Sequence, residues 1–193
     1  MSLPKSESRE LDPRAMRALA HPLRLTLLEL AGLEGSLTAT RAATLTGESS
    51  ASCSFHLRQL AKYGFLEEAE GGEGRERPWR LRTLSHRWSD EEPAADVLDA
   101  LLVQRIGQQL VEWLQRRRRE PAEWRKAAPG TYSILHLTSE ELTALGEQLI
   151  GLSEPYLERA ADPATRPEGA RPVRLVGMAF PLPQHDDVDK TSK

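Results

Sequence analysis

The stretch Leu45–Gly64, LTGESSASCSFHLRQLAKYG, predicts a turn followed by a helix, and it decides how the surrounding chain folds. Gly47 permits the turn and Gly64 supplies the stop. Ser49 or Ser50 can accept hydrogen bonds from the free N–H groups at the helix start. Apolar side chains recur at spacings of three and four residues and make one face of this helix: Cys53, Leu57, Leu60 and Ala61.

A second stripe of this helix carries small, hydroxyl and basic side chains: Ser54, Arg58 and Lys62, with Ala51 and Phe55 beside them. No acidic residue lies among them. Such a surface suits a helix that enters the major groove of DNA. The alternative is an ordinary amphipathic helix whose basic face is merely solvated, so the flanking segments decide between the two.

Three shorter helices are predicted before this one. Asp12 can cap the first, and the His21-Pro22 step ends it and begins the second. Gly32 and Gly35 are expected to end the second helix, and Thr38 can cap the third.

A β-hairpin is predicted after the helix, because residues 65–69 and 78–82 have strand character and residues 70–76 contain three glycines. Helices followed by such a hairpin predict a winged helix-turn-helix, whose hairpin contacts a neighbouring phosphate or minor groove. The arginines of this region are Arg75, Arg77, Arg80 and Arg82. Five glutamates accompany them, so we expect only moderate non-specific binding: Glu67, Glu68, Glu70, Glu73 and Glu76.

Three segments here resemble the ArsR-type family of winged-helix transcription regulators: LAHPLRLTLLELA, SCSFHLRQLAKYGFLE and GRERPWRL. They stand in the family's order and spacing over about residues 11–83, and the resemblance is much weaker afterwards. It implies a homodimeric repressor that binds double-stranded DNA and whose hold on its operator is changed by an effector.

The resemblance also implies where DNA is contacted. The family's positions fall on Ser50, Ala51, Ser54 and Phe55 of the helix, and near Arg75 and Arg77 of the wing. The stripe derived from the residues themselves adds Arg58 and Lys62. We expect base contacts from Ser50, Ser54, Phe55 and Arg58, and backbone contacts from Lys62, Arg75 and Arg77.

A long helix is predicted from Pro93 to about Arg119. Its main apolar line is Leu98, Leu102, Ile106, Leu110 and Leu114, flanked by Leu101, Val103, Val111 and Trp113. One long apolar stripe needs a partner. We favour a two-fold dimer, which would set the recognition helices about 34–36 Å apart; the alternative is packing on the chain's own C-terminal part.

The sequence departs from the metal-sensing branch of the family. That branch has a CxC pair where this chain has Thr38-Ala39-Thr40, and it uses Asp and His across the long helix, where this chain has Asp96 and Asp99 but no His. Soft and borderline metals prefer clustered Cys and His ligands. We therefore predict no metal site of the family's kinds, no cofactor, and a small organic effector.

The C-terminal part predicts a small strand–helix–strand unit. Strands are expected at 132–137 and 173–180, and a capping box at 138–141 begins a helix that runs to about Ala161. Trp113 and Trp124 are candidates to line an apolar effector pocket between this unit and the long helix. A plain dimer or subdomain contact is the alternative for both tryptophans.

Several single residues have a bland and a functional interpretation. Cys53 is expected to be a small buried hydrophobe, with a redox switch as the alternative. His21 is expected to be a helix-junction residue rather than a metal ligand. His56, at the edge of the apolar face, is expected to pack or to contact one phosphate rather than bind metal. Trp79 is expected to anchor the hairpin against the core.

Composition and charge restrict the classes of protein to which this chain could belong. The chain has 193 residues and a formal net charge of −3, so its bulk charge does not favour nucleic acid. A single cysteine excludes an internal disulfide, the first residues are not a secretory signal, and no apolar run could span a membrane. A cytoplasmic protein is expected.

Together these features predict a mainly α fold with a β-hairpin wing, a long dimerisation helix and a small C-terminal strand–helix–strand unit. The expected divisions are a disordered tail (1–10), a DNA-binding domain (11–84), a connector with the dimerisation helix (85–120), an accessory or sensing unit (121–183) and a second tail (184–193). The rival function is a protein-interaction module that uses the winged helix as a scaffold. No catalytic residues and no enzymatic activity are expected.

Overall fold

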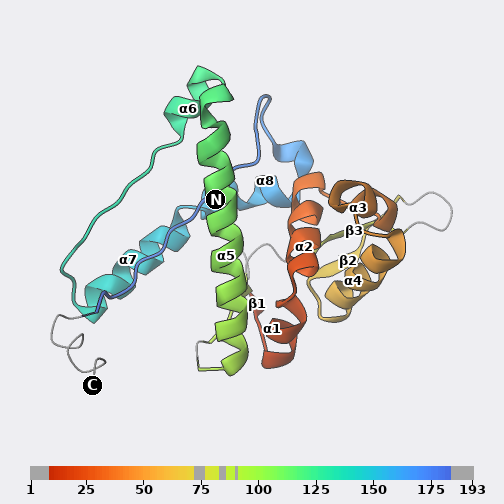
Figure 1. Cartoon of the computed structure of the whole chain (residues 1–193), viewed down its shortest axis with the longest axis horizontal. Helices are drawn as coiled ribbons and strands as arrows, with labels where there is room; N and C mark the ends of the chain where they lie inside the picture. Colours follow the sequence, from red (N-terminus) through yellow and green to blue (C-terminus); the bar gives the residue numbers. More distant parts are fainter. Residues whose placement is uncertain (1–8, 72–76, 83–85, 90, 184–193) are drawn as a thin grey trace. The chain divides into compact units, whose positions relative to one another are not determined.

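The computed structural model describes residues 9–71, 77–82, 86–89 and 91–183 (Figure 1). This part of the chain is mainly helical and carries two small two-stranded sheets. It forms two compact units: the described residues up to Thr131 together with Leu157–Ala170, and Tyr132–Tyr156 together with the described residues from Arg171 onward. No helix among the described residues is long and apolar enough to cross a membrane.

Four helices open the first unit: α1 (Pro13–Leu19), α2 (Pro22–Glu34), α3 (Ala39–Thr46) and α4 (Ser50–Lys62). The predicted caps are confirmed. The side chains of Asp12, Thr38 and Ser49 accept hydrogen bonds from backbone N–H groups of the first helical turns at 2.7, 3.2 and 3.1 Å. Gly35 ends α2 with a φ of 79°, whereas Gly32, which was expected to share that role, lies inside the helix.

The predicted hairpin is present as an antiparallel pair, β2 (Leu66–Glu68) and β3 (Trp79–Leu81). The strands are shorter than predicted, and Glu67 lies opposite Arg80. Trp79 packs against the core and exchanges two backbone hydrogen bonds with Leu37, at 2.8 and 3.0 Å. These bonds tie the hairpin to the segment that precedes α3.

A second pair of strands was not predicted from the sequence. Strand β1 (Arg9–Glu10) runs parallel to β4 (His86–Arg87). The predictions of a disordered tail through residue 10 and of a plain connector from residue 85 are wrong at these positions. The Arg9 guanidinium donates to the Tyr63 carbonyl at 2.6 Å, so a charged segment is held by a distant helix end. The rest of the two predicted tails, residues 1–8 and 184–193, lies outside the described chain.

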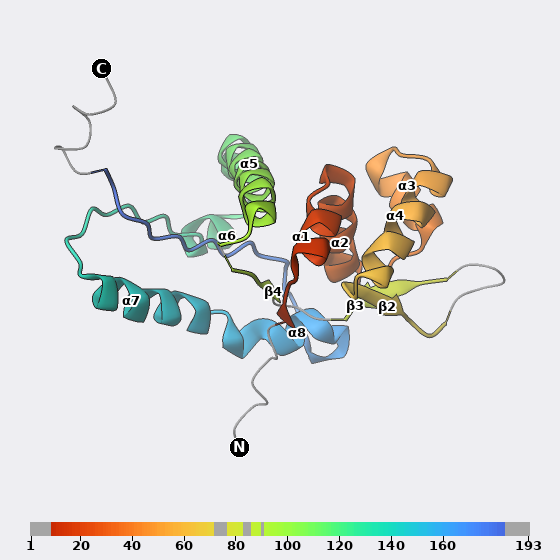
Figure 2. The same ribbon diagram turned by 90° about the horizontal axis from the view of Figure 1, so that it is seen from below.

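The first unit has one apolar core, built from α1, α2, α4, the β2–β3 hairpin and the start of α5. Figures 1 and 2 both place α2 beside α4, with the hairpin next to α4. The large side chains that are fully buried are Met16, Leu27, Leu37, Leu57, Leu60, Phe65, Leu66 and Leu98. Burial of such side chains stabilises the fold by roughly 1.5–3 kcal/mol each.

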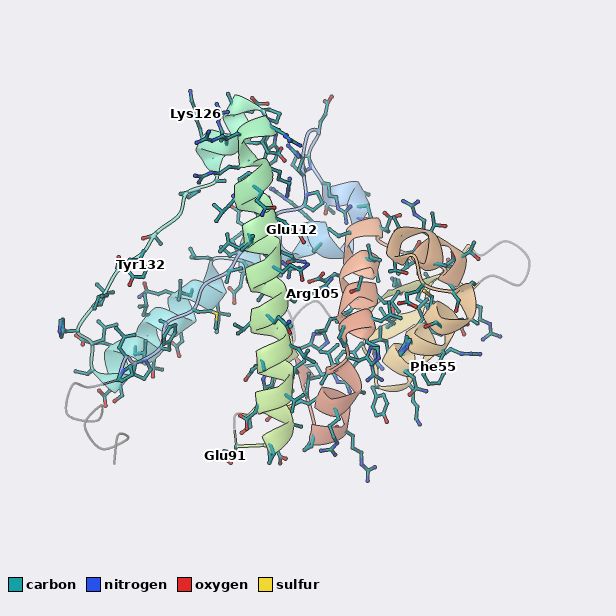
Figure 3. All side chains as sticks on the ribbon, in the orientation of Figure 1. Phe55, Glu91, Arg105, Glu112, Lys126 and Tyr132 are labelled. Carbon is teal, nitrogen blue, oxygen red and sulfur yellow. The ribbon has the colours of Figure 1, made fainter. Side chains whose placement is uncertain are left out.

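The long helix is confirmed as α5 (Pro93–Arg116), which continues into the 3₁₀ turn η1 (Arg117–Arg119). The prediction that the apolar stripe of this helix faces a second copy along its whole length is wrong at the start of the helix. Leu98 is fully buried in the chain's own core, and Leu102 packs against that core. Further along, Arg105 forms an ion pair with Glu29 of α2 (Figure 3).

A different face of α5 is exposed. Small and apolar side chains recur along it at spacings of three and four residues: Ala100, Val103, Gly107, Leu110 and Leu114. Val97 and Val111 lie beside this stripe, and both are more than half exposed. Two of the predicted interface residues, Leu110 and Leu114, therefore belong to the exposed face, whereas Leu98 and Leu102 do not.

The C-terminal unit does not begin at residue 121 as predicted. A short helix, α6 (Ala122–Ala127), follows Pro121 and belongs to the first unit, as do α8 (Leu157–Ala161) and η3 (Pro163–Thr165). The second unit holds α7 (Ser139–Gly151) and η2 (Glu154–Tyr156). The capping box of Thr138 and Glu141 is confirmed. The expected continuous helix to Ala161 breaks near Pro155, which cannot donate a helical hydrogen bond.

The two predicted C-terminal strands do not form. Residues 132–137 and 173–180 carry no strand assignment in the described chain. A strand requires a neighbouring strand as hydrogen-bonding partner, and neither segment is paired with a strand within the described residues. The predicted strand–helix–strand unit is therefore reduced to its helix, α7.

Candidate nucleic-acid interface

The turn between α3 and α4 is fixed by local hydrogen bonds. Gly47 takes a left-handed conformation with a φ of 76°, and its N–H donates to the Ala43 carbonyl at 2.9 Å. The Thr46 hydroxyl accepts from the Glu48 N–H at 3.2 Å and lies 3.7 Å from the Cys53 sulfur. The start of α4 is thus held in a set direction relative to α3.

The two faces of α4 separate as predicted. Cys53, Leu57 and Leu60 are fully buried, which confirms the bland interpretation of Cys53 as a small core residue. The opposite face is exposed at Ser50, Ala51, Phe55, Arg58 and Lys62, and Ser54 is half-buried.

Phe55 exposes 51% of its surface (Figure 3). Arg58 makes no ion pair within the part of the chain that the structure describes. The face therefore offers an aromatic ring and an uncompensated guanidinium on one rigid helix.

The arginines of the hairpin are compensated. Arg77 pairs with Glu68 at 2.7 Å, and Arg80 pairs with Glu67 at 2.7 Å across the two strands. Arg77 keeps 72% of its side chain exposed, so it can still exchange its partner for another anion. The predicted contact residue Arg75 lies outside the described residues.

A basic hollow lies beside α4 and was not predicted from the sequence. It has a volume of about 240 Å³ and is lined by Arg14, Arg17 and Ala18 of α1, Arg24 of α2, and Gln59 and Tyr63 at the end of α4. Arg14 and Arg17 stand three residues apart, so they share one face of α1. That spacing was the available signal, but only the fold shows that this face borders α4.

A histidine pair lies under the exposed face of α4. The rings of His21 and His56 have centroids 4.6 Å apart, and the Nδ1 atom of His56 is enclosed without a hydrogen-bond partner among the described residues. Burial, followed by the charge of Arg24, lowers the pKa of His21. Burial, followed by His21 and Arg24, lowers the pKa of His56. Both effects favour the neutral form of the two imidazoles.

The tryptophans predicted to line an effector pocket have different places. Trp113 borders a hollow of about 600 Å³ together with Arg117, Arg118, Arg125 and Ala128, all within the first unit. The Arg116 guanidinium lies 5.2 Å from the centre of the Trp113 ring. Trp124, on α6, is not among the lining residues. The hollow is thus basic and aromatic rather than apolar.

Within the described ranges, no group of three or more His, Cys, Asp or Glu side chains could hold a metal ion. No model of a known protein family matches this chain, and a comparison with curated proteins gives no match either.

Proposed function

We propose that this protein is a dimeric, sequence-specific DNA-binding transcription regulator, a winged helix-turn-helix of the ArsR-like kind that acts as a repressor. One observation carries the proposal. α4 is anchored by a fully buried face and exposes a continuous acid-free stripe of small, hydroxyl, aromatic and basic side chains. The major groove of DNA admits one α-helix, and each base pair there offers its own pattern of donors, acceptors and methyl groups.

Each residue of the stripe has a role that its chemistry suits. Arg58 can donate two hydrogen bonds to a guanine, Ser50 and Ser54 can bond to several bases, and Phe55 can contact a thymine methyl group. Lys62 and Arg77 would bind phosphates, as would Arg75.

The basic hollow beside α4 extends this backbone contact. Arg14 and Arg17 are exposed and line the hollow together with Gln59 of α4. Phosphate contacts of this kind fix the register of a protein on DNA without reading sequence.

The exposed stripe of α5 supports the homodimer. Val103, Leu110 and Leu114 expose between 46% and 55% of their surface, on a helix whose other face is committed to the core. A Cβ atom added at Gly107 would meet nothing within 4 Å, so a second helix could approach closely there. Packing α5 against α5 would bury these side chains on both copies.

The hollow at Trp113 supports a small organic effector that carries a negative charge. Three arginines can pair with a carboxylate or phosphate, and the indole offers an apolar surface. Binding there would act on DNA affinity by favouring one dimer geometry over another.

A protein-interaction module remains the second candidate, because Glu67 and Glu68 neutralise two arginines of the hairpin and the net charge is −3. Salt dependence separates the candidates. Binding to phosphates weakens steeply as salt rises, with a slope of about −0.9 per phosphate in a log–log plot.

The first experiment is selection of random duplex DNA by the purified protein at physiological salt. An inverted repeat with half-sites about 34–36 Å apart is the expected result. Arg58→Ala should then weaken operator binding by about 1–3 kcal/mol and relax specificity at one base pair, with the dimer intact. Recovery of no motif by a folded, dimeric protein would favour the interaction module, and unchanged affinity of Arg58→Ala would refute the role of that residue.

A further inference from the structure

Two extended segments of the second unit, 132–137 and 173–182, are not paired as strands within the described residues. The backbone groups of residues 132–137 and 175–182 form no backbone–backbone hydrogen bond within the described chain. Gly177 lies against Leu149 of α7, and Figures 1 and 2 show this segment running along that helix. Leu149 of α7 thus packs against the segment, while the backbone N–H and C=O groups of residues 175–182 have no backbone partner among the described residues.

The same segments expose an unusual amount of apolar surface. The exposed fractions range from 43% at Leu137 to 90% at Tyr132 (Figure 3). The exposed large apolar side chains are Tyr132, Ile134, Leu135, Leu137, Val173, Leu175, Val176, Met178, Phe180 and Leu182. Soluble monomers rarely expose a continuous apolar patch of more than a few hundred Å².

The area matches what a dimer needs. A side chain of this kind carries roughly 60–120 Å² of apolar surface. With about 60% of it exposed on ten side chains, two copies carry on the order of 1,100 Å² of exposed apolar surface, which is the upper limit of what their pairing could bury. That limit is comparable with the roughly 1,000 Å² expected of a biological interface, before any contribution from α5.

The lack of charge favours a second copy as the partner. The stretches YSILHL (132–137) and LVGMAFPL (175–182) contain no Asp, Glu, Lys or Arg, and Arg174, near one end, is the one charged residue of the two segments. Symmetric pairing of a strand with its own copy sets like side chains near each other, which charged residues would oppose. Exposed strand edges are usually protected by charged side chains or prolines, and in these segments Arg174 and Pro181 have that character, each near an end of the second segment.

We propose that these two segments become strands only in the homodimer, where they pair with the corresponding segments of a second copy in one intermolecular sheet. The inference rests on the homodimer of the proposed function but not on its DNA contacts. The strand-like sequence of these two segments and the lack of strand pairing at these described residues are then consistent, because the hydrogen-bonding partner belongs to the other copy.

The test compares Met178→Pro with Met178→Thr in the full chain. Met178 is 62% exposed and its N–H has no backbone partner, so neither variant should disturb the single chain. Proline removes a ladder hydrogen bond from both copies, whereas threonine keeps the N–H and suits a strand. We expect sedimentation equilibrium to show dimerisation weakened by proline roughly fivefold to 150-fold, because two hydrogen bonds of about 0.5–1.5 kcal/mol each are lost, and little affected by threonine.

Hydrogen exchange supplies the second measurement. Amides of 132–137 and 175–180 should be protected in concentrated wild-type protein and lose protection on dilution below the dimer dissociation constant. Fast exchange at every concentration, protection independent of concentration, or equal effects of proline and threonine would each overturn the inference. Selection of random duplex DNA by the same preparations tests the proposed function separately. If the two segments are protected but no DNA motif is recovered, the intermolecular sheet stands and only the proposed DNA-binding function is refuted.

Discussion

Glu68 holds Arg77 in an exposed ion pair on the β2–β3 hairpin, and replacing Glu68 by glutamine tests whether this arginine contacts DNA. The two side chains meet at 2.7 Å and are 56% and 72% exposed. An ion pair this exposed stabilises by about 0.2–1 kcal/mol. A phosphate must displace Glu68 to reach Arg77, so removing the carboxylate should strengthen DNA binding by the same amount at each hairpin.

For a dimer with two hairpins the gain is about 0.4–2 kcal/mol, or roughly twofold to 25-fold in affinity for non-specific duplex. Fluorescence anisotropy over a series of salt concentrations measures it, and the log–log slope should steepen by up to about 0.9 for each newly engaged phosphate. Glu147→Gln on α7 is the matched control, because it changes net charge equally on an exposed helix of the second unit. Equal effects of the two variants, or none from Glu68→Gln, would refute the assigned role of Arg77.

Three further predictions concern stability and assembly. Leu57→Ala, at a fully buried position of α4, should lower the free energy of unfolding by about 2–5 kcal/mol in urea titrations; a change below about 1 kcal/mol would contradict its place in the core. Burial is the main cause that lowers the pKa values of His21, His56 and His86 from 6.5, so the unfolded chain binds more protons just below that pH. Unfolding free energy should therefore fall as pH drops below about 6.5, and His56→Gln should reduce this dependence, which an unchanged pH profile would contradict. Leu110→Glu should disrupt the proposed contact between two α5 helices and yield monomers in sedimentation experiments without lowering the thermal midpoint of the monomer, and an unaltered dimer would place the interface elsewhere.

Local sequence signals were sufficient for α1–α4 and the hairpin. Capping by Asp12, Thr38 and Ser49 depends on residues within one turn of each helix start, so it can be read without knowing the fold. The two faces of α4 follow from the spacing of Cys53, Leu57 and Leu60 for the same reason. The candidate surface at Ser50, Ala51, Ser54, Phe55, Arg58 and Lys62 was available from the sequence because it is the complement of that apolar face.

Features that depend on contacts between distant segments could not be predicted from local sequence. The apolar residues of α5 looked like one stripe, but Leu98 joins the core while Leu110 stays exposed, because α1 and α2 cover only part of the helix. Strand β1 exists because it pairs with β4, which is distant in the sequence, and the Arg9 side chain also donates to the Tyr63 carbonyl. The basic hollow exists because α1 brings Arg14 and Arg17 beside the end of α4.

The sequence by itself determined where helices begin and end and which side of each short helix is apolar, since these depend on hydrogen bonds and periodicity within a few residues. Only the tertiary structure decided which partner each apolar face receives. Residues 132–137 and 173–180 make the difference clear: their composition suits strands, but a strand is completed by hydrogen bonds to a neighbouring strand, and the described part of the chain places no strand beside them.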